Sequence, residues 1–172
     1  MRWILPVRLV LLCGCAGAGG QAAAGAADSG AAPQVGTSAI EREVLEQVNR
    51  HRAERRLPPL LWSEDVAGVA RKHSRAAAQG TATLADGNGR QRARGVSVRM
   101  PVKDWGESVT QLDVDGGLAG SLLFRVLVSS PADRARIEGS FELTGIGVAR
   151  DDTGTYYLTQ LFITSAPGFG RP

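Results

Sequence analysis

Two strand-like segments joined by a short turn near the C-terminal end place the strongest constraint on the fold. Residues 143–150 (LTGIGVAR) and 155–163 (TYYLTQLFI) are rich in apolar, β-branched and aromatic side chains, which favour strands. The intervening DDTG has the residues of a tight turn, so the two segments predict a β-hairpin. Because helix-like segments precede this hairpin, we predict a layered α+β domain and not alternating strand–helix units.

A first amphipathic helix is predicted to begin at Ser38. Ser38 and Glu41 form the S-x-x-E pattern of a capping box, in which each side chain binds a free backbone amide of the first turn. Ile40, Val44 and Val48 recur every four residues, so they predict one buried stripe.

A second helix is predicted to begin at Ser63, where Glu64 and Asp65 would face the positive helix end. One face of this helix is formed by Val66, Val69, Ala70, His73 and Ala77. A histidine among apolar residues is most often a scaffold residue. We therefore interpret His73 as structural, with a ligand role as the alternative.

A third helix is predicted over about residues 115–128, with Leu118, Leu122 and Val126 facing the core. The segment 95–105 is expected to be extended, and Pro101 would place it at a sheet edge or a bend. Along with Leu122, the buried positions are expected to include Ile146 and Leu161, one in each hairpin strand.

The segment SSPADRARI (129–137) predicts a short fourth helix. Ser130 is suited to the N-cap and Pro131 to the first turn. Asp133 follows Ser130 by three residues, so it is predicted to support the helix start and not to bind a ligand.

Residues 1–14 have the pattern of a secretory leader. Arg2 is followed by an apolar run, broken by Arg8, that is too short to span a bilayer. The run ends in LCGC, which resembles the lipobox of bacterial lipoproteins. Cys15 follows a glycine and fits the lipidated position better than Cys13. We therefore predict a lipid anchor at Cys15, and an ordinary secretory signal is the alternative.

Residues 15–37 are rich in alanine and glycine and almost free of large apolar side chains. Such a segment cannot bury enough surface to fold, so it is predicted to be a flexible tether with a reach on the order of 25 Å. The folded domain is expected over 38–166, a length that suits one compact unit. Residues 167–172 are expected to be a frayed tail.

Charge argues against a nucleic-acid partner. Removal of the leader leaves 18 basic and 17 acidic residues, a net charge of +1. The basic clusters at 51–56 and 90–94 are expected to be a solvated helix end and a solvated loop. No aromatic residues interleave with them, as they would in many nucleic-acid sites.

Six short blocks occur in a characteristic order: VNRHRAERRLPPLLW (48–62), VARKHSRAAA (69–78), WGES (105–108), SSPADRARI (129–137), GIGVA (145–149) and YYLTQLF (156–162). With these blocks the chain resembles the CAP superfamily, and most closely its bacterial, disulfide-free branch. The resemblance implies an α-β-α sandwich with a central antiparallel sheet and an open cleft. It does not fix an activity, since members have been linked to lipid binding, protein interaction, metal binding and peptidase activity.

The cleft of this family commonly holds two histidines and two glutamates, which suit a divalent metal or acid–base chemistry. The resemblance assigns Glu107 to one glutamate position. No histidine occurs in 80–89 and no acid in 116–129, where two other positions belong. Tyr157 stands at the remaining histidine position. Since one of the four positions is retained, we expect no bound metal and no cofactor.

Glu107 is the residue whose role the resemblance leaves open. The favoured role is structural, with the carboxylate holding the cleft loop through backbone amides. Ligand contact is the second alternative and catalysis the third. The family pattern implies that Glu107, Tyr157 and Gln160 border one cleft, so these three are candidate ligand-contacting residues. No catalytic residue is assigned.

We therefore expect an exported, monomeric, non-catalytic binding module, lipid-anchored to a bacterial membrane, which would be the outer membrane where two are present. Its ligand would be a lipid, a glycan or a protein. Enzymatic activity is left open, with a non-enzymatic role favoured. The alternatives are a divergent hydrolase that uses Glu107 and a purely structural envelope protein.

Overall fold

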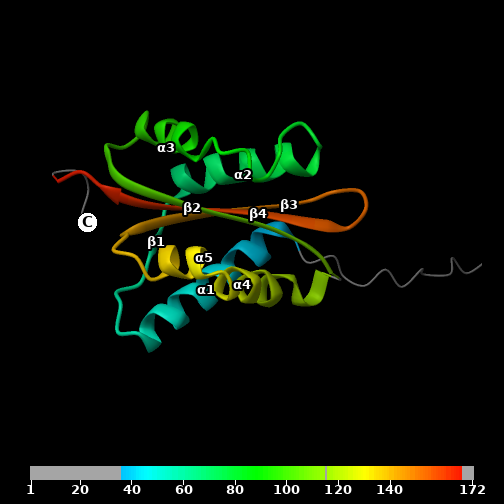
Figure 1. Ribbon diagram of the computed structural model, residues 1–172, viewed down its shortest axis with the longest axis horizontal. Coiled ribbons are helices and arrows are strands. Elements are labelled where there is room, and N and C mark those ends of the chain that lie inside the picture. Colours follow the sequence, from blue (N-terminus) through cyan, green and yellow to red (C-terminus); the bar gives the residue numbers. More distant parts are fainter. Residues whose placement is uncertain (1–35, 115, 168–172) are drawn as a thin grey trace, which may run out of the picture. The chain divides into compact units, whose positions relative to one another are not determined.

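A four-stranded sheet lies between two layers of helices in the computed structural model, which describes residues 36–114 and 116–167 (Figure 1). One face is covered by α2 (Glu64–Ala78) and α3 (Gly89–Ser97). The other is covered by α1 (Thr37–Glu54), α4 (Ala119–Ser129) and α5 (Pro131–Ile137), with the short 3-10 helix η1 (Gly116–Leu118) before α4. The predicted α+β class and α-β-α layering are confirmed.

The sheet has the strand order β1-β3-β4-β2. Its strands are β1 (Leu61–Trp62), β2 (Val102–Asp113), β3 (Leu143–Arg150) and β4 (Thr155–Ser165). The predicted hairpin is formed by β3 and β4, and β2 pairs antiparallel with β4 on its other side. The short β1 pairs in parallel with β3 and was not predicted. Two residues are too few to give a recognisable strand pattern.

The sheet divides the apolar core into two clusters. The larger one joins α1 and α4 to the sheet and includes Ile40, Val44, Leu123 and the fully buried Ile146. The smaller one lies under α2 and α3 and consists of Val66, Ala70, Val96, Leu161 and Ile163. The predicted burial of Ile146 and Leu161 is confirmed.

Helix α2 packs directly on the backbone of β3. A Cβ atom at Gly145 would lie 2.1 Å from the backbone nitrogen of Ala67, and one at Gly147 would lie 2.2 Å from that of Arg71. Any larger residue at either position would therefore force the helix away from the sheet. The GIGVA block thus supplies the contact surface on which α2 rests.

The buried face predicted for the third helix is wrong. Leu118 is 64% exposed and Val126 is 37% exposed, and Leu122 is only partly buried. Helix α4 instead buries the neighbouring stripe of Ala119, Leu123 and Leu127. A shift of one residue turns a helix by about 100°. Because both stripes are apolar, periodicity alone could not choose between them.

The extended segment predicted over 95–105 is correct only at its end. Residues 89–97 form α3, which buries Ala93 and Val96, and strand β2 begins at Val102. The strand then continues to Asp113, beyond the predicted range. Basic residues on the exposed face of α3 hide its short apolar stripe in the sequence, so the helix was missed.

The short helix after residue 130 is confirmed. Helix α5 begins at Pro131, and the Oγ of Ser130 accepts a hydrogen bond of 3.3 Å from the backbone N–H of Asp133. The Asp133 carboxylate accepts from Arg136 at 2.7 Å. Asp133 therefore serves the first turn of α5, as predicted.

The capping box predicted at Ser38 and Glu41 is wrong. Helix α1 begins at Thr37, one residue before Ser38, with Gly36 at its N-cap and no side-chain cap. Glu41 is 2% exposed and is turned toward Arg71 of α2. A carboxylate this deeply buried needs charge-assisted partners, and it finds them across the sheet edge and not in its own first turn.

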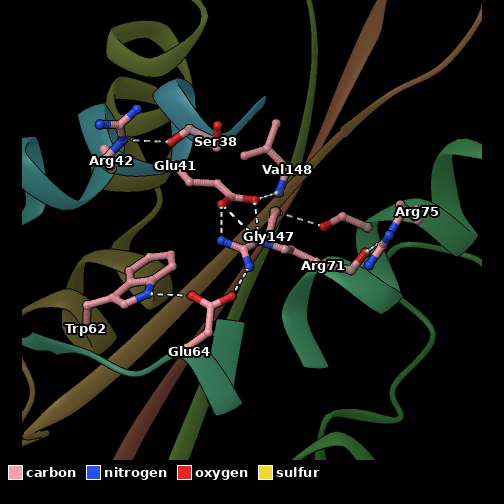
Figure 2. Close-up of polar contacts among 10 residues, drawn as sticks. Ser38, Glu41, Arg42, Trp62, Glu64, Arg71, Arg75, Gly147 and Val148 are labelled. Atoms are coloured by element: carbon pink, nitrogen blue, oxygen red, sulfur yellow. Dashed lines mark hydrogen bonds and ion pairs between the residues drawn. The ribbon is translucent and has the colours of Figure 1, made fainter. Parts of the chain in front are cut away.

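Figure 2 shows how Glu41 joins three elements. The Nη2 of Arg71 donates to Glu41 Oε2 at 2.7 Å, and the backbone N–H of Val148 donates to Oε1 at 3.1 Å. Arg71 also binds Glu64, whose other oxygen accepts from the indole N–H of Trp62 at 3.0 Å. The bonds to Glu41 raise the pKa of Arg71 above its usual value, against the effect of burial.

The contact with Val148 protects an edge of the sheet. β1 covers β3 only at Leu143 and Thr144. Beyond them no strand in the described part of the chain lies beside the outer edge of β3, and free N–H groups at such an edge could pair with another chain. The Glu41 carboxylate occupies one of these groups, so it satisfies the backbone and connects α1 to α2.

We predict that Arg71→Met lowers the free energy of unfolding by about 3 kcal/mol, because it leaves the buried Glu41 carboxylate without its cation. Urea unfolding of the full chain measures this. The matched control is Arg75→Met one turn further along α2, where the exposed guanidinium, among residues 36–114 and 116–167, binds only a carbonyl of its own helix. This control should change stability by no more than about 0.5 kcal/mol. Equal losses in the two variants would contradict the role given to Glu41.

Candidate functional site

Glu107 projects from β2 toward α3, where the side chain of Arg92 meets it. Both carboxylate oxygens accept from this guanidinium, Oε1 from Nε and Oε2 from Nη2 at 2.8 Å. The sequence predicts that Glu107 binds backbone amides of the cleft loop. This prediction is wrong about the partner, which is the side chain of Arg92. The basic cluster 90–94, predicted to be a solvated loop, lies in α3 and turns Arg92 inward.

Arg92 binds a second carboxylate at the same time. Its Nη1 donates to Oδ2 of Asp86 at 3.0 Å and its Nη2 donates to Oδ1 at 2.8 Å. The backbone N–H of Asn88 also donates to Oδ1 at 2.8 Å. All three charged side chains are mostly buried, with exposed fractions between 11% and 18%. One guanidinium thus neutralises part of the charge of two carboxylates.

The charges of this cluster shift the pKa values of its members. The hydrogen bonds from Arg92 hold the pKa of Asp86 far below its usual range, against the effect of burial. Burial lowers the pKa of Arg92, but the bonds to Glu107 and Asp86 outweigh it and keep that pKa above the usual value. Asp86 is therefore ionised at neutral pH and holds no proton to give as a general acid.

His73 is buried beside this cluster, with an exposed fraction of 6%. Its Nδ1 lies 2.9 Å from the hydroxyl of Thr159, and that hydroxyl lies 2.9 Å from the hydroxyl of Ser74. The Ser74 hydroxyl donates to the carbonyl of Gly147 at 2.8 Å. The Nε2 of His73 makes no hydrogen bond within the described residues and lies 3.7 Å from Asp86 Oδ2.

The surroundings of His73 favour its neutral form. Burial lowers the pKa of the imidazole, and the positive charge of Arg92 lowers it further. The charges of Asp86 and Glu107 and the backbone of Thr83 act in the opposite direction but do not reverse the shift. His73 is therefore neutral at neutral pH. The sequence predicts a scaffold residue among apolar side chains, but the imidazole lies beside Thr159 and Asp86.

Two cavities border the cluster. The larger, of about 620 Å³, lies between α2 and α3 and is lined by His73, Asp86 and Arg92 together with residues of both helices. The smaller, of about 330 Å³, is lined by Glu107, Trp105, Gly89 and Arg136 among others. The larger volume falls in the range of small-molecule sites. The charged cluster therefore separates two hollows in the surface.

The expected convergence of Glu107, Tyr157 and Gln160 is not found. Glu107 is opposite Leu161 in the β2–β4 register and Tyr157 is opposite Gln111, about 13 Å further along the strand. The Tyr157 hydroxyl donates to Asp151 at 3.1 Å. Gln160 is fully buried on the other face of the sheet, because side chains alternate along a strand. A ligand contact for any of the three stays a prediction.

The N-terminal predictions fall on residues that the structure does not describe. The leader 1–14, the lipidated Cys15 and the tether 15–37 lie outside the described residues, apart from the last two positions of the tether. Helix α1 begins at Thr37, close to the predicted start of the domain at residue 38. The tail prediction over 167–172 lies outside the described residues apart from residue 167.

The sequence matches the profile of the cysteine-rich secretory protein family, CAP, over residues 45–162. This match covers more than half of the chain. The protein belongs to the CAP family. Comparison with curated proteins gives no match.

Three solved structures show the same CAP fold. An outer surface protein of Borrelia burgdorferi aligns with a TM-score of 0.64 at 12% identity, over 77% of this chain and 97% of that one. An extracellular protein with an SCP domain from Bacillus anthracis aligns with a TM-score of 0.60 at 23% identity, over 75% of this chain and 41% of that one. A cysteine-rich secretory protein of Staphylococcus aureus aligns with a TM-score of 0.58 at 20% identity, over 76% of this chain and 40% of that one. This chain thus spans less than half of the last two proteins.

The polar side chains at this site differ from the two histidines and two glutamates that are common in the CAP family. The segment 80–89, where the family resemblance places a histidine, supplies Asp86, and α3 supplies Arg92. Among the described residues no three His, Cys, Asp or Glu side chains are grouped as ligands of a metal ion. None of the helices in the described part of the chain is long and apolar enough to cross a membrane.

Sequence reasoning missed Asp86 and Arg92. Asp86 precedes Gly87 in a segment that reads as an ordinary turn, and Arg92 is one of three arginines within five residues. The available signal was the spacing of Ala93 and Val96, three residues apart among basic residues, which is typical of one face of a short helix. An α3 helix with Ala93 and Val96 inward also turns Arg92 toward the sheet.

We predict that Glu107→Gln lowers the free energy of unfolding by about 1–3 kcal/mol, because Arg92 loses one of its two ionised acceptors. Urea unfolding at neutral pH measures the change. Glu142→Gln, on the exposed end of the same sheet, is the control and should be near neutral. An unchanged stability for Glu107→Gln would show that the Arg92 contact contributes nothing to the fold.

We further predict that acid weakens the fold through His73. Since the folded-state pKa lies below the unfolded value of 6.5, the unfolded chain takes up the proton first. The free energy of unfolding should therefore fall as the pH drops below about 6.5, and level off below the folded-state pKa. His73→Asn keeps a polar side chain that can hydrogen-bond to Thr159 but does not titrate, so its loss of stability between about pH 7 and 5 should be smaller. His51 is present in both proteins, so its contribution cancels. Parallel pH profiles would contradict the prediction.

Proposed function

We propose that this protein is an exported CAP domain that binds a ligand without transforming it and is lipid-anchored through Cys15 to a bacterial membrane. The observation that carries the proposal is the position of Arg92, which occupies both oxygens of Glu107 and both oxygens of Asp86. A cavity large enough for a small molecule lies beside this neutralised cluster.

The cluster argues against a hydrolase. A general base must be free to take a proton from water or substrate, and each oxygen of Glu107 already accepts from a guanidinium. Tyr157, the other residue considered for a hydrolytic role, donates to Asp151 on the hairpin turn. A purely structural envelope protein would have no use for the cavity between α2 and α3.

The location is proposed from the N-terminal sequence. A short apolar leader followed by Cys15 supports export and acylation, and Ala16 after the cysteine favours the outer membrane in a cell that has two. The three similar structures are those of an outer surface protein, an extracellular protein and a cysteine-rich secretory protein, which supports export. We propose a monomer that binds a lipid, glycan or protein ligand, with no cofactor and no nucleic acid.

The anchor has a direct test. Cys15→Ser should release the protein from the membrane fraction, because each buried methylene of an acyl chain contributes about 0.8 kcal/mol to membrane binding. Immunoblots of soluble and membrane fractions measure this, and Cys13→Ser serves as the matched control that should stay with the membrane. Retention of the Cys15→Ser variant would reject the anchor.

Binding without turnover is tested on the native, lipidated protein. Mass spectrometry of material that co-purifies with wild type and with Glu107→Gln should identify the same unmodified ligand in both. A calorimetric titration with zinc should show no stoichiometric binding. If zinc binds wild type and not Glu107→Gln while both proteins melt alike, Glu107 is a metal ligand and the hydrolase alternative is restored.

A further inference from the structure

The sheet has two outer edges, and they are protected differently. The edge of β3 is covered in part by β1 and by the Glu41 carboxylate, which accepts from the Val148 N–H. The opposite edge belongs to β2, a strand of 12 residues that pairs only with β4 in the described part of the chain. A long edge without a neighbouring strand offers its backbone groups to another chain. Whether β2 can bind a partner therefore depends on which of its backbone groups are blocked.

The hydrogen bonds of β3 show which residues of β2 point outward. The N–H and C=O groups of one strand residue face the same neighbouring strand, and this direction alternates along the strand. Thr144 accepts from Ser63 beside β1 and Val148 donates to Glu41, so the even-numbered residues of β3 face its outer edge. The odd-numbered residues of β3 therefore bond to odd-numbered residues of β4. This leaves the even-numbered residues of β4 and β2 to bond to each other.

The odd-numbered residues of β2 thus direct their N–H and C=O groups away from the sheet. Trp105 agrees with this direction, since its N–H donates to Oδ1 of the Asp104 side chain at 2.8 Å. Val109 and Gln111 point the same way. Their N–H and C=O groups have no hydrogen-bond partner among residues 36–114 and 116–167. These four groups form the bare edge of β2.

The start of β2 has features that keep other chains away, and the bare edge lacks them. Pro101 precedes the strand, the register is irregular just after it, and the Asp104 side chain occupies a backbone N–H. Each of these features protects an edge strand. Residues 108–112 contain no proline and no charged side chain. Gln111 is exposed and Val109 is partly exposed, so the protection ends where the bare edge begins.

The spacing of the bare edge matches a polypeptide backbone. Val109 and Gln111 each present one donor and one acceptor, and two residues of a strand span about 7 Å. A second chain in an extended conformation repeats its donors and acceptors at the same interval, so it can satisfy all four groups. A sugar or a lipid has no such repeat. The bare edge therefore favours a peptide segment as its ligand.

A second copy of this chain fits the edge poorly. The antiparallel register that pairs Val109 of one copy with Gln111 of the other uses the bare groups of both. It also puts Glu107 of each copy directly opposite Asp113 of the other, and like charges in such pairs are destabilising. Residues 104–118 include four acidic side chains and no basic one. The strand therefore favours a partner of the opposite charge.

Asp113 is the acidic residue best placed to select that partner. It ends β2 two residues after Gln111, so its side chain lies on the same face of the strand as those of Val109 and Gln111. It is exposed and makes no ion pair or hydrogen bond with another described residue. Glu107, in contrast, is already bound to Arg92. A basic side chain opposite Asp113 would supply the charge that this end of the strand lacks.

We propose that the bare edge of β2 binds an extended segment of a partner protein as a fifth strand of the sheet, with a lysine or arginine of that segment beside Asp113. This proposal rests on the proposed binding function and assigns it a protein partner and a surface. The smaller cavity, lined in part by Gly106 and Glu107, lies at the other end of the bare edge. It can receive one side chain of the added strand, as pockets beside such edges do.

The first test needs no partner. Amide hydrogen exchange of the ¹⁵N-labelled full chain in detergent should be at least about tenfold faster at Val109 and Gln111 than at Thr110 and Leu112, whose N–H groups bond to β4. Equal protection at all four amides would show that the outer edge is covered, and it would overturn the proposal.

The second test uses a probe peptide of alternating threonine and valine with an arginine at each end and both termini blocked. Its binding to the full chain should slow exchange at Val109 and Gln111 and leave Thr110 unchanged. A matched peptide with a glutamate at each end should bind at least about fivefold more weakly, because it meets Asp113 with a like charge. Asp113→Lys should reverse this preference. Glu46→Lys, an exposed change on α1, is the control and should retain it.

A proline on the edge gives a third test. Val109→Pro removes an outward N–H that β4 does not use, and proline is tolerated at such positions of edge strands. The variant should keep the fold, as measured by circular dichroism, and bind the arginine peptide about tenfold more weakly. Val109→Thr keeps the N–H and should bind as wild type does. If Val109→Pro does not fold, Gln111→Pro makes the same change at the next outward residue. Undiminished binding by a folded proline variant would contradict the proposal.

Failure of this proposal and failure of the proposed function give different results. If the arginine peptide does not bind, or binds without slowing exchange at Val109 and Gln111, the fifth strand is rejected. A ligand that co-purifies with the native protein would then still support the binding function. If both peptides bind wild type equally well, the role of Asp113 is rejected. If neither peptide binds and no ligand co-purifies, the partner and the binding function both fail.

Discussion

The arrangement of the layers depends on one buried carboxylate. Glu41 leaves α1, passes the outer edge of β3 and binds Arg71 on the helix that covers the opposite face. The ion pair between Glu41 and Arg71 compensates both charges for the water that they lose on burial. A shift of α1 or α2 would break this ion pair and leave a buried charge without a partner. The position of α2 on the sheet then decides where His73 and Ser74 stand, and with them one wall of the cavity.

At the candidate site, the guanidinium of Arg92 lies between two carboxylates. Where the family commonly gathers histidines and glutamates, this protein brings Arg92 between Glu107 and Asp86. A guanidinium is planar, permanently charged and held in place by its hydrogen bonds. It gives the two carboxylates fixed partners without supplying a reactive centre, and this is why we favour recognition over catalysis.

The sequence allowed the layers, the hairpin and α5 to be predicted because each depends on local signals: alternation, turn residues and a proline after a serine. It did not allow the roles of Glu41, Arg92 and Asp86 to be predicted, since each depends on a partner far away in the chain. Glu41 reads as a capping residue until Arg71 is placed beside it. Leu122 and Leu123 lie on two neighbouring apolar stripes of α4, and only packing against the rest of the fold decides between them.

The glycine contact between α2 and β3 also determines which wall of the cavity can adapt. Helix α2 rests on backbone at Gly145 and Gly147, so no side chain between them can change rotamer to absorb a displacement. Helix α3 touches its neighbours through the side chains of Val96 and Arg92, which can adjust. We therefore expect α2 to act as a rigid template and α3 to move when the cavity is filled.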